Sequence, residues 1–227
     1  MKTVLVVAAH PDDEILGCGG TMARLVREGA QVHIAIMGEG LTARLDQRES
    51  KQDAAMASLY NDARRASAVV GAHSLRFFDL PDNRFDTLPL LDVIKPIEQL
   101  IASLGPDAVF THHGGDLNVD HQTVNRAVLT ATRPKPGLGV KEVLAFEIPS
   151  STEWGFAHLQ PNFRANVFFD ITASLQTKIE ALNCYTSEIA PFPHPRSGQA
   201  LEAIGRRWGS VVGCGAAEAF ELVRGIR

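Results

Sequence analysis

The sequence predicts an α/β fold of the three-layer, Rossmann-like kind, in which helices cover both faces of a mostly parallel sheet. Two observations lead to this fold class. Short β-branched apolar runs alternate with longer segments of helical periodicity up to residue 148, which is typical of parallel strands joined by crossover helices. The first run, "TVLVVAA" (3–9), is short and almost continuously apolar, as a strand buried on both faces of a parallel sheet is.

The elements follow from these patterns in chain order. Apolar runs predict strands at 3–9, 31–38, 74–80, 107–112 and 142–148. Amphipathic segments, the first of them closed by Gly29, predict helices at 19–29, 51–70, 90–105 and 119–132. Beyond residue 148 the pattern loosens into a strand at 167–171, a helix at 173–185, the turn-rich "APFPHPRSGQ" (190–199) and a helix over "AAEAFELVR" (216–224).

The length and composition favour one soluble domain. The chain has 227 residues, 45% of them apolar, and neither a linker nor a repeat divides it. We therefore expect a single domain over 1–227, in which residues 149–227 are an elaboration that covers one side of the active-site rim.

Charge and cysteine content exclude several classes of partner. The formal net charge is −4 and the basic residues are scattered, so nucleic acid is not an expected partner. Without a long apolar run we expect no membrane insertion. The three cysteines, Cys18, Cys184 and Cys214, lie too far apart in sequence to suggest a thiolate zinc site or a disulfide framework. A reducing cytoplasm is the expected location, and the oligomeric state, a homo-oligomer included, stays open.

Two polar clusters follow predicted parallel strands. "HPDDE" (10–14) comes directly after the first strand, and "DLNVDH" (116–121) comes shortly after the fourth. Ligands of open α/β sheets bind outside the carboxyl ends of the strands. The two clusters should therefore meet on one rim of the sheet.

The residue types in these clusters favour a divalent metal. Catalytic zinc usually takes three protein ligands and a water. His10 and Asp13, three apart on a turn that enters a helix, and His121 from the other loop supply a two-histidine, one-carboxylate set. Asp12 then stays free to act as general base on the attacking water, while Asp120 accepts a ring N–H of a histidine and orients it.

A purely structural role for these residues is the alternative to metal binding. Acids just before a helix often serve as N-caps and dipole partners, and a histidine at a strand end is often only solvated. For "PDDE" alone that explanation would be preferred. With a second charged loop on the same rim it becomes the less favoured one.

The clusters also carry a family resemblance. "AHPDDEILGCGGTMARL" and "DLNVDHQTVNRAV" resemble the two motifs of the LmbE/PIG-L family of zinc-dependent N-deacetylases, which remove acetyl groups from N-acetylglucosamine-type sugars and related compounds. The resemblance implies a Rossmann-like fold, one Zn²⁺ per chain, His10, Asp13 and His121 as its ligands, and Asp12 as general base. It also implies a small N-acetylated sugar as substrate.

One position departs from the family pattern. Family members often carry a histidine three residues before the last zinc-binding histidine, whereas this chain has Asn118 there. An amide donates a hydrogen bond to an oxyanion, but it does not deliver a proton to the departing amine. Either His112, His113 or His194 then protonates the amine, or Asp12 serves twice.

Further residues are candidates for substrate binding. Arg196 and His194 lie in the proline-flanked "HPRS", where a surface turn is an equal alternative. Arg44, in the loop after the second strand, is either an anion-binding group or a solvated arginine. The remaining candidates are His113 and Asp116 beside the second cluster and Glu218 in "AAEAFELVR", which otherwise belongs to an ordinary amphipathic face. The glycines of "GCGG" lack dinucleotide-binding spacing and are expected to allow close helix–sheet packing.

The leading functional hypothesis is a zinc-dependent hydrolase that removes an N-acetyl group from an N-acetylated sugar or sugar conjugate, such as a nucleotide sugar or glycan precursor, and releases acetate. One alternative is an amidohydrolase of a thiol conjugate. Another is a non-catalytic sugar- or nucleotide-binding domain, since a fold does not by itself give activity. Asp12 argues against this last alternative, because a binding module has no need of an unliganded carboxylate beside a metal.

Overall fold

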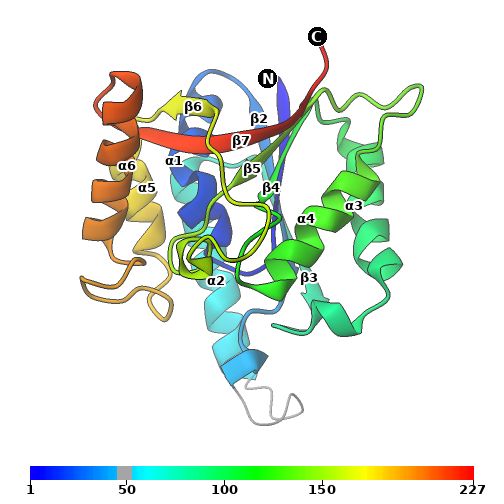
Figure 1. Cartoon of the computed structure of the whole chain (residues 1–227). Helices are drawn as coiled ribbons and strands as arrows, with labels where there is room; N and C mark the ends of the chain where they lie inside the picture. Colours follow the sequence, from blue (N-terminus) through cyan, green and yellow to red (C-terminus); the bar gives the residue numbers. More distant parts are fainter. Residues whose placement is uncertain (45–52) are drawn as a thin grey trace.

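The computed structural model describes residues 1–44 and 53–227 and confirms an α/β fold with helices on both faces of a mostly parallel sheet (Figure 1). Its strands are β1 (Thr3–Ala8), β2 (Gln31–Gly38), β3 (Ser74–Leu80), β4 (Ala108–His112), β5 (Glu142–Phe146), β6 (Val167–Asp170) and β7 (Ala217–Gly225). Its helices are α1 (Asp13–Arg27), α2 (Asp53–Val70), α3 (Leu90–Leu104), α4 (Val119–Ala131), α5 (Leu175–Leu182) and α6 (Gly198–Val212). Short 3-10 turns are η1 (Thr42–Arg44), η3 (Phe85–Thr87) and η4 (Glu153–Gly155).

The sheet order is β3-β2-β1-β4-β5-β7-β6. The first five strands in this order pair in parallel, and β7 pairs antiparallel with both β5 and β6. β1 lies in the middle and is buried on both faces, which explains its unbroken apolar run. Alternate β1 residues enter two cores, Val4 and Val6 toward α1 and α2, and Leu5 and Val7 toward α3 and α4.

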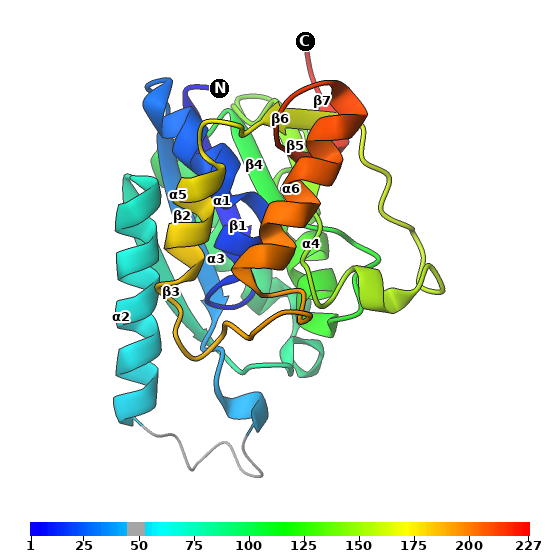
Figure 2. The same ribbon diagram turned by 90° about the vertical axis from the view of Figure 1, so that its left-hand side faces the viewer.

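The helices divide between the two faces of the sheet. α3 and α4 cover one face, and α1, α2, α5 and α6 cover the other (Figures 1 and 2). The chain passes from β1 through α1 to β2 on one side and reaches β4 on the other side only after α3. The connections therefore reverse direction between β1 and β4, and such a switch point is where open α/β sheets bind ligands.

The last element differs from the sequence prediction. "AAEAFELVR" was expected to form a helix, but it lies in β7, between β5 and β6. Ala and Glu favour helices, yet pairing on both edges and burial of residues 217–220 outweigh that preference, because strand formation depends mainly on tertiary context. The helix predicted at 19–29 also begins earlier, at Asp13.

Residues 149–227 extend the same sheet by β6 and β7. The rim is covered by the long loops before β6 and before α6, not by the last helices as the sequence suggested (Figure 2). Across the described residues, no helix is both long and apolar enough to cross a membrane.

Candidate metal centre

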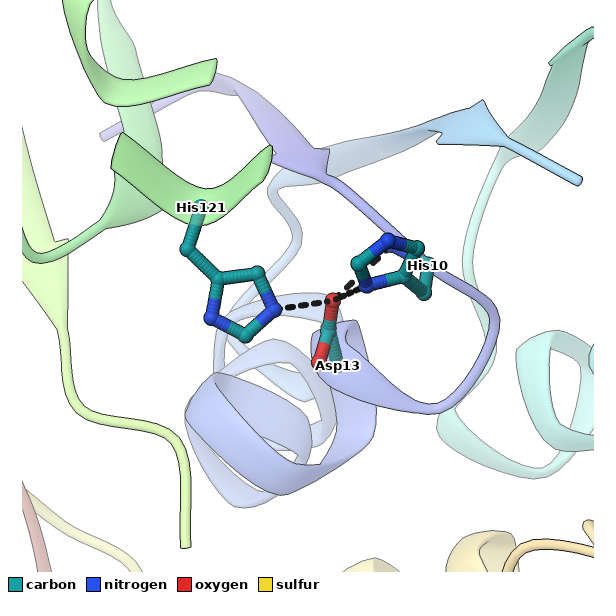
Figure 3. Close-up of side chains that lie close together, drawn as sticks. All are labelled: His10, Asp13 and His121. Atoms are coloured by element: carbon teal, nitrogen blue, oxygen red, sulfur yellow. Dashed lines mark hydrogen bonds and ion pairs between the residues drawn. The ribbon is translucent and has the colours of Figure 1, made fainter. Parts of the chain in front are cut away.

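His10, Asp13 and His121 meet at the switch point (Figure 3). His10 follows β1, Asp13 begins α1, and His121 lies in the first turn of α4. The Oδ2 atom of Asp13 lies 3.4 Å from Nδ1 of His10 and 3.2 Å from Nε2 of His121. The predicted ligand set is therefore brought together, with one nitrogen of each ring facing the same carboxylate oxygen.

Carboxylates hold the far side of each ring. Nε2 of His10 lies 2.9 Å from Oδ2 of Asp120, which is the orienting contact expected for Asp120. Asp116 lies 3.0 Å from Nδ1 of His121 and accepts hydrogen bonds from Ser151 and Thr152. Carboxylates placed in this way fix ring orientation and raise ligand basicity in metal sites. Asp116 therefore supports His121 and does not line the cleft, contrary to the prediction that it binds substrate.

The sequence analysis missed Asp82, which also contacts His10. Its Oδ1 lies 3.2 Å from Nε2 of His10, and the residue is 4% exposed. Asp82 follows β3, another strand of the parallel part of the sheet. The rule that assigned the two clusters to the rim would have found it, since the carboxyl ends of parallel strands share one edge.

The electrostatics of the cluster fit a cation. Both ring nitrogens of His121 are buried without a hydrogen-bond partner of good geometry, although Asp116 and Asp13 lie 3.0 Å and 3.2 Å away. Burial alone would lower the pKa of His121, but Asp13 and Asp116 raise this pKa to about 9. Burial alone would raise the pKa of Asp13, yet the neighbouring imidazoles, His121 before His112, hold this pKa well below its ordinary value. The acids around the two imidazoles therefore favour a positive charge at this place. A divalent metal supplies that charge when it replaces the proton on a histidine ring.

Asp12 lies beside this cluster without joining it. It occupies the N-cap position of α1 but makes no capping hydrogen bond, so the N-cap explanation does not account for its side chain. Its carboxylate is 2% exposed and accepts a hydrogen bond from Nη1 of Arg196 at 2.9 Å. Burial raises the pKa of Asp12 well above its ordinary value, against the opposing effect of Arg196.

The backbone of Asp12 is strained, and a hydrogen bond to Glu14 holds it in place. Its φ of 101° is in the left-handed region, where a side chain is disfavoured. The Asp12 N–H donates to Glu14 at 3.1 Å, and the hydroxyl of Tyr185 donates to the other oxygen of Glu14. The third acid of "DDE" is thus an internal support that aims Asp12 at the cleft.

A cleft of about 550 Å³ opens over the cluster. Besides the three candidate ligands and Asp12, its walls include Arg196 and Asn118 among the predicted residues, and Asp82, Ser150 and Trp154 among those not predicted. Arg196 reaches the cleft as expected, but it contacts Asp12 and donates from Nε to Ser150 at 2.7 Å. His194 does not line the cleft and instead packs edge-on against Trp154, with ring centroids 5.9 Å apart.

Asn118 has a structural role that the sequence analysis did not assign. Its side-chain oxygen accepts from the Asp120 N–H at 2.8 Å and so caps α4. Its amide nitrogen donates to Asn83 at 2.9 Å, in the wall of the cleft. The amide nitrogen carries a second N–H, so it can donate to a bound substrate while it keeps its hydrogen bond to Asn83.

Three other candidates lie away from the cleft or outside the described residues. His113 contacts Glu221 and the Pro161 carbonyl in a separate cavity. Glu218 is 5% exposed and bonds to α1 and Lys178, so the structure does not bring it to the substrate. Arg44 ends η1 next to cleft-lining Ala43, but its side chain is outside the described part of the chain.

His112, a further candidate proton donor, is also inaccessible to substrate. It is fully buried, and its Nε2 accepts from the Ala9 N–H at 2.8 Å. Its ring stacks on His121 at 4.0 Å between centroids. None of the three histidines considered as proton donors lines the cleft.

Comparison with known proteins identifies related sequences. The family model PIG-L, described as GlcNAc-PI de-N-acetylase, matches residues 5–132. The uncharacterized deacetylase YaiS of Escherichia coli (strain K12) is 30% identical over 155 residues, which are 66% of this chain and 76% of the relative. The 4-oxalmesaconate hydratase of Pseudomonas putida (strain KT2440) is 30% identical over 211 residues, covering 82% and 74%. The diacetylchitobiose deacetylase of Thermococcus kodakarensis is 26% identical over 234 residues, covering 100% and 85%.

A solved structure extends the likeness to the whole fold. The conserved protein TT1542 from Thermus thermophilus matches with a TM-score of 0.78 at 23% identity, over 100% of this chain and 97% of that one. The family model covers more than half of the chain, and it includes every candidate metal ligand. This protein belongs to the PIG-L/LmbE family.

Proposed function

We propose that this protein is a zinc-dependent hydrolase that removes the N-acetyl group from an N-acetylated sugar or sugar conjugate and releases acetate. One observation carries the proposal: His10, Asp13 and His121 converge in a cleft next to Asp12, a carboxylate that is not part of the ligand set. Deacetylation is the activity named for the family model and for two of the relatives described above.

The three ligands would hold the metal. Two imidazoles and one carboxylate are a donor set of catalytic zinc sites, and Asp120 and Asp116 orient the two rings. When bound there, zinc supplies Lewis acidity toward water and toward the amide carbonyl of the substrate.

Asp12 is the proposed general base. Its carboxylate lies in the cleft wall, and the Arg196 guanidinium fixes one of its oxygens. It takes a proton from the attacking water, and Arg196 prevents the carboxylate from turning away. Because His112, His113 and His194 do not line the cleft, Asp12 is also the group we propose to return this proton to the departing amine.

Hydration is a second candidate function. The Pseudomonas putida relative is named as a hydratase and aligns over most of this chain. The observation that favours hydration is that no histidine besides His10 and His121 lines the cleft in the described residues. Hydration breaks no C–N bond: the hydroxyl of water adds to one carbon of a double bond and the proton taken by Asp12 goes to the other carbon, so no leaving amine has to be protonated.

One experiment separates these proposals. The zinc-loaded protein is incubated with N-acetylglucosamine, diacetylchitobiose and a UDP-linked N-acetyl sugar, and in parallel with 4-oxalmesaconate. Acetate release with loss of one acetyl group by mass supports deacetylation, provided that Asp12→Ala abolishes it. Addition of one water to 4-oxalmesaconate without any acetate release would replace the first proposal by the second.

A further inference from the structure

Helix α1 is interrupted directly behind the metal-binding turn. Cys18 has φ −145° and ψ 21°, which are not helical, so α1 consists of two helical segments. The first segment carries Asp13, and the second begins at Gly19. A break of this kind leaves carbonyl oxygens free on one side and N–H groups free on the other, and in a buried place these groups need partners.

Glu218 supplies the partner for the second segment. From β7, its two carboxylate oxygens accept hydrogen bonds from the N–H groups of Gly20, at 3.0 Å, and Thr21, at 2.6 Å. A carboxylate at a helix N-terminus satisfies these donors and opposes the positive end of the helix dipole.

Lys178 supplies the partner for the first segment. From α5, its ammonium donates to the carbonyl of Leu16 at 2.7 Å and to Oε1 of Glu218 at 2.5 Å. A cation at a helix C-terminus has the favourable sign for that end of the dipole. The pair thus closes both sides of the break, each charge at the end that suits it.

The first segment has little room to move sideways. A Cβ atom on Gly17, in the first segment, would lie 2.4 Å from Cδ2 of Phe146, and a Cβ atom on Gly20, in the second segment, would lie 2.9 Å from Cδ1 of Ile171. These approaches confirm that the glycines of "GCGG" allow close packing. The first segment is thus packed closely against Phe146 at Gly17, and at the break itself its contacts are those with Lys178 and, through Lys178, with Glu218.

The free energy of folding does not by itself explain why Lys178 and Glu218 form a buried ion pair. Lys178 is 6% exposed and Glu218 is 5% exposed, and the desolvation of buried charges offsets most of their attraction. A neutral pair of similar shape would stabilise the fold about as well. What a neutral pair lacks is a donor for the Leu16 carbonyl, three residues after Asp13.

We propose that Lys178 and Glu218 are positioning residues that set the direction of the segment Asp13–Gly17 and thereby place Asp13 in the metal site. The inference rests on the proposed metal site. It assigns to Glu218 a role in the site different from the substrate contact predicted from the sequence.

The test compares zinc affinity with stability in the full chain. The variants are Lys178→Met, Glu218→Gln and the neutral double variant Lys178→Met/Glu218→Gln. Zinc affinity is measured by competition with a chromophoric chelator, the Co²⁺-loaded proteins are compared by absorption spectrum, and stability is measured by urea unfolding without metal. Ile101→Ala is the control, because Ile101 is a buried core residue of α3 on the other face of the sheet.

The double variant gives the decisive result. Removing both charges relieves the unpaired charge of each single variant, so its stability should return toward that of the unaltered protein. Its zinc affinity should nevertheless stay about 10–100-fold lower, with an altered Co²⁺ spectrum, while Ile101→Ala loses stability and keeps its affinity.

Two outcomes would overturn the inference. One is zinc affinity in the double variant equal to that of the unaltered protein. The other is an affinity loss in Ile101→Ala as large as that of the double variant. If the unaltered protein itself bound no zinc, the proposed metal site would fail instead, so the two failures are distinguishable.

Discussion

Replacing Arg196 with methionine should leave the buried carboxylate of Asp12, the proposed base, without this positively charged partner. Nη1 of Arg196 lies 2.9 Å from Oδ2 of Asp12, and Asp12 is 2% exposed. Arg196→Met keeps a long apolar stem in the loop but removes the positive charge and the hydrogen bonds to Asp12 and Ser150. We expect the variant to lose both stability and turnover. It should retain zinc, because the Arg196 guanidinium bonds to Asp12 and Ser150 rather than to the three ligands.

The size of the stability loss follows from burial. Unit charges 2.9 Å apart attract by about 6 kcal/mol at an effective dielectric constant of 20. Desolvation offsets part of this attraction, and the Arg196 side chain is 25% exposed. Removing one partner of a buried pair costs roughly 3–5 kcal/mol, so the exposure of Arg196 places the expected loss near the lower end, about 3 kcal/mol.

A double-mutant cycle separates the pair from the rest of the loop. Free energies of unfolding are measured for Arg196→Met, Asp12→Asn and the double variant, in urea and without metal. Without the buried charge at position 12, removal of Arg196 should cost less, although the contact of Nη1 with Glu188 at 3.6 Å is still lost, and the expected coupling energy is about 2–3 kcal/mol. Arg206→Met is the matched control, because Arg206 pairs with Glu202 on the surface and is 65% exposed. This control should change stability by less than about 1 kcal/mol.

The turnover that Arg196→Met loses should not exceed the loss caused by removing Asp12 itself. Removal of a general base typically costs roughly 10²–10⁴-fold, and a misdirected base should cost less than a deleted one. Arg196→Lys should recover only part of the rate, since an ammonium lacks the planar fork that bonds Asp12 and Ser150 together. Equal stability of Arg196→Met and the unaltered protein, together with full turnover, would refute this account of Arg196.

Four further outcomes test the site. Asp12→Ala should keep zinc in chelator competition and lose roughly 10²–10⁴-fold in turnover, whereas joint loss of zinc would make Asp12 a ligand. Asp116→Asn should weaken zinc binding about 10–100-fold by freeing the His121 ring, and unchanged affinity would contradict that role. Asn118→Ala should lose about 1 kcal/mol of stability because it removes the N-cap of α4, whereas Asn118→Ser keeps the cap. A turnover loss of about 10²–10³-fold in both variants would identify Asn118 as an oxyanion donor. Full turnover in the serine variant would exclude that role. Chelation should lower stability by about 2.7 kcal/mol relative to zinc at 100-fold its Kd, read as the thermal midpoint with and without added zinc, and a midpoint indifferent to zinc would argue against the site.

The candidate metal site could be predicted from the sequence because the position of its residues follows from the sheet topology. The apolar run of β1 identifies a central parallel strand, and the carboxyl ends of parallel strands share one rim. His10, Asp13 and His121 lie directly after or near such strand ends. Asp82 obeys the same rule, but the acids of "DLPDNRFD" (79–86) are spaced apart and no histidine accompanies them, so this segment does not stand out as a ligand cluster in the sequence.

Other features depended on contacts between distant segments. Glu218 belongs to β7 because β5 and β6 flank it, and the local sequence "AAEAFELVR" contains no sign of those neighbours. Asn118 was interpreted from its spacing to His121, yet its oxygen caps α4. An N-cap asparagine and an oxyanion donor look alike in sequence, since both use one polar amide near the start of a helix.

Different parts of the chain contribute the candidate ligands and the residues that contact them. The matched region, residues 5–132, contains the three candidate ligands, the proposed base and the aspartates beside the two rings. The contacts that hold the base and its helical turn come from later residues: Arg196 on Asp12, Tyr185 on Glu14, and the pair of Lys178 and Glu218 at the break in α1. Trp154, in the cleft wall, also lies outside the matched region.

A metal and an adjacent carboxylate are compatible with both hydrolysis and hydration, because either reaction begins by deprotonating water. The outcome depends on where the substrate lies relative to that water and on how Asp12 is aimed at it. The loops before β6 and before α6 contribute Trp154 and Arg196 to the cleft wall, and the matched region contributes Asn83 and Asn118. The residues that decide between deacetylation and hydration are therefore to be sought among the cleft residues around Asp12, in these two loops and in the matched region alike.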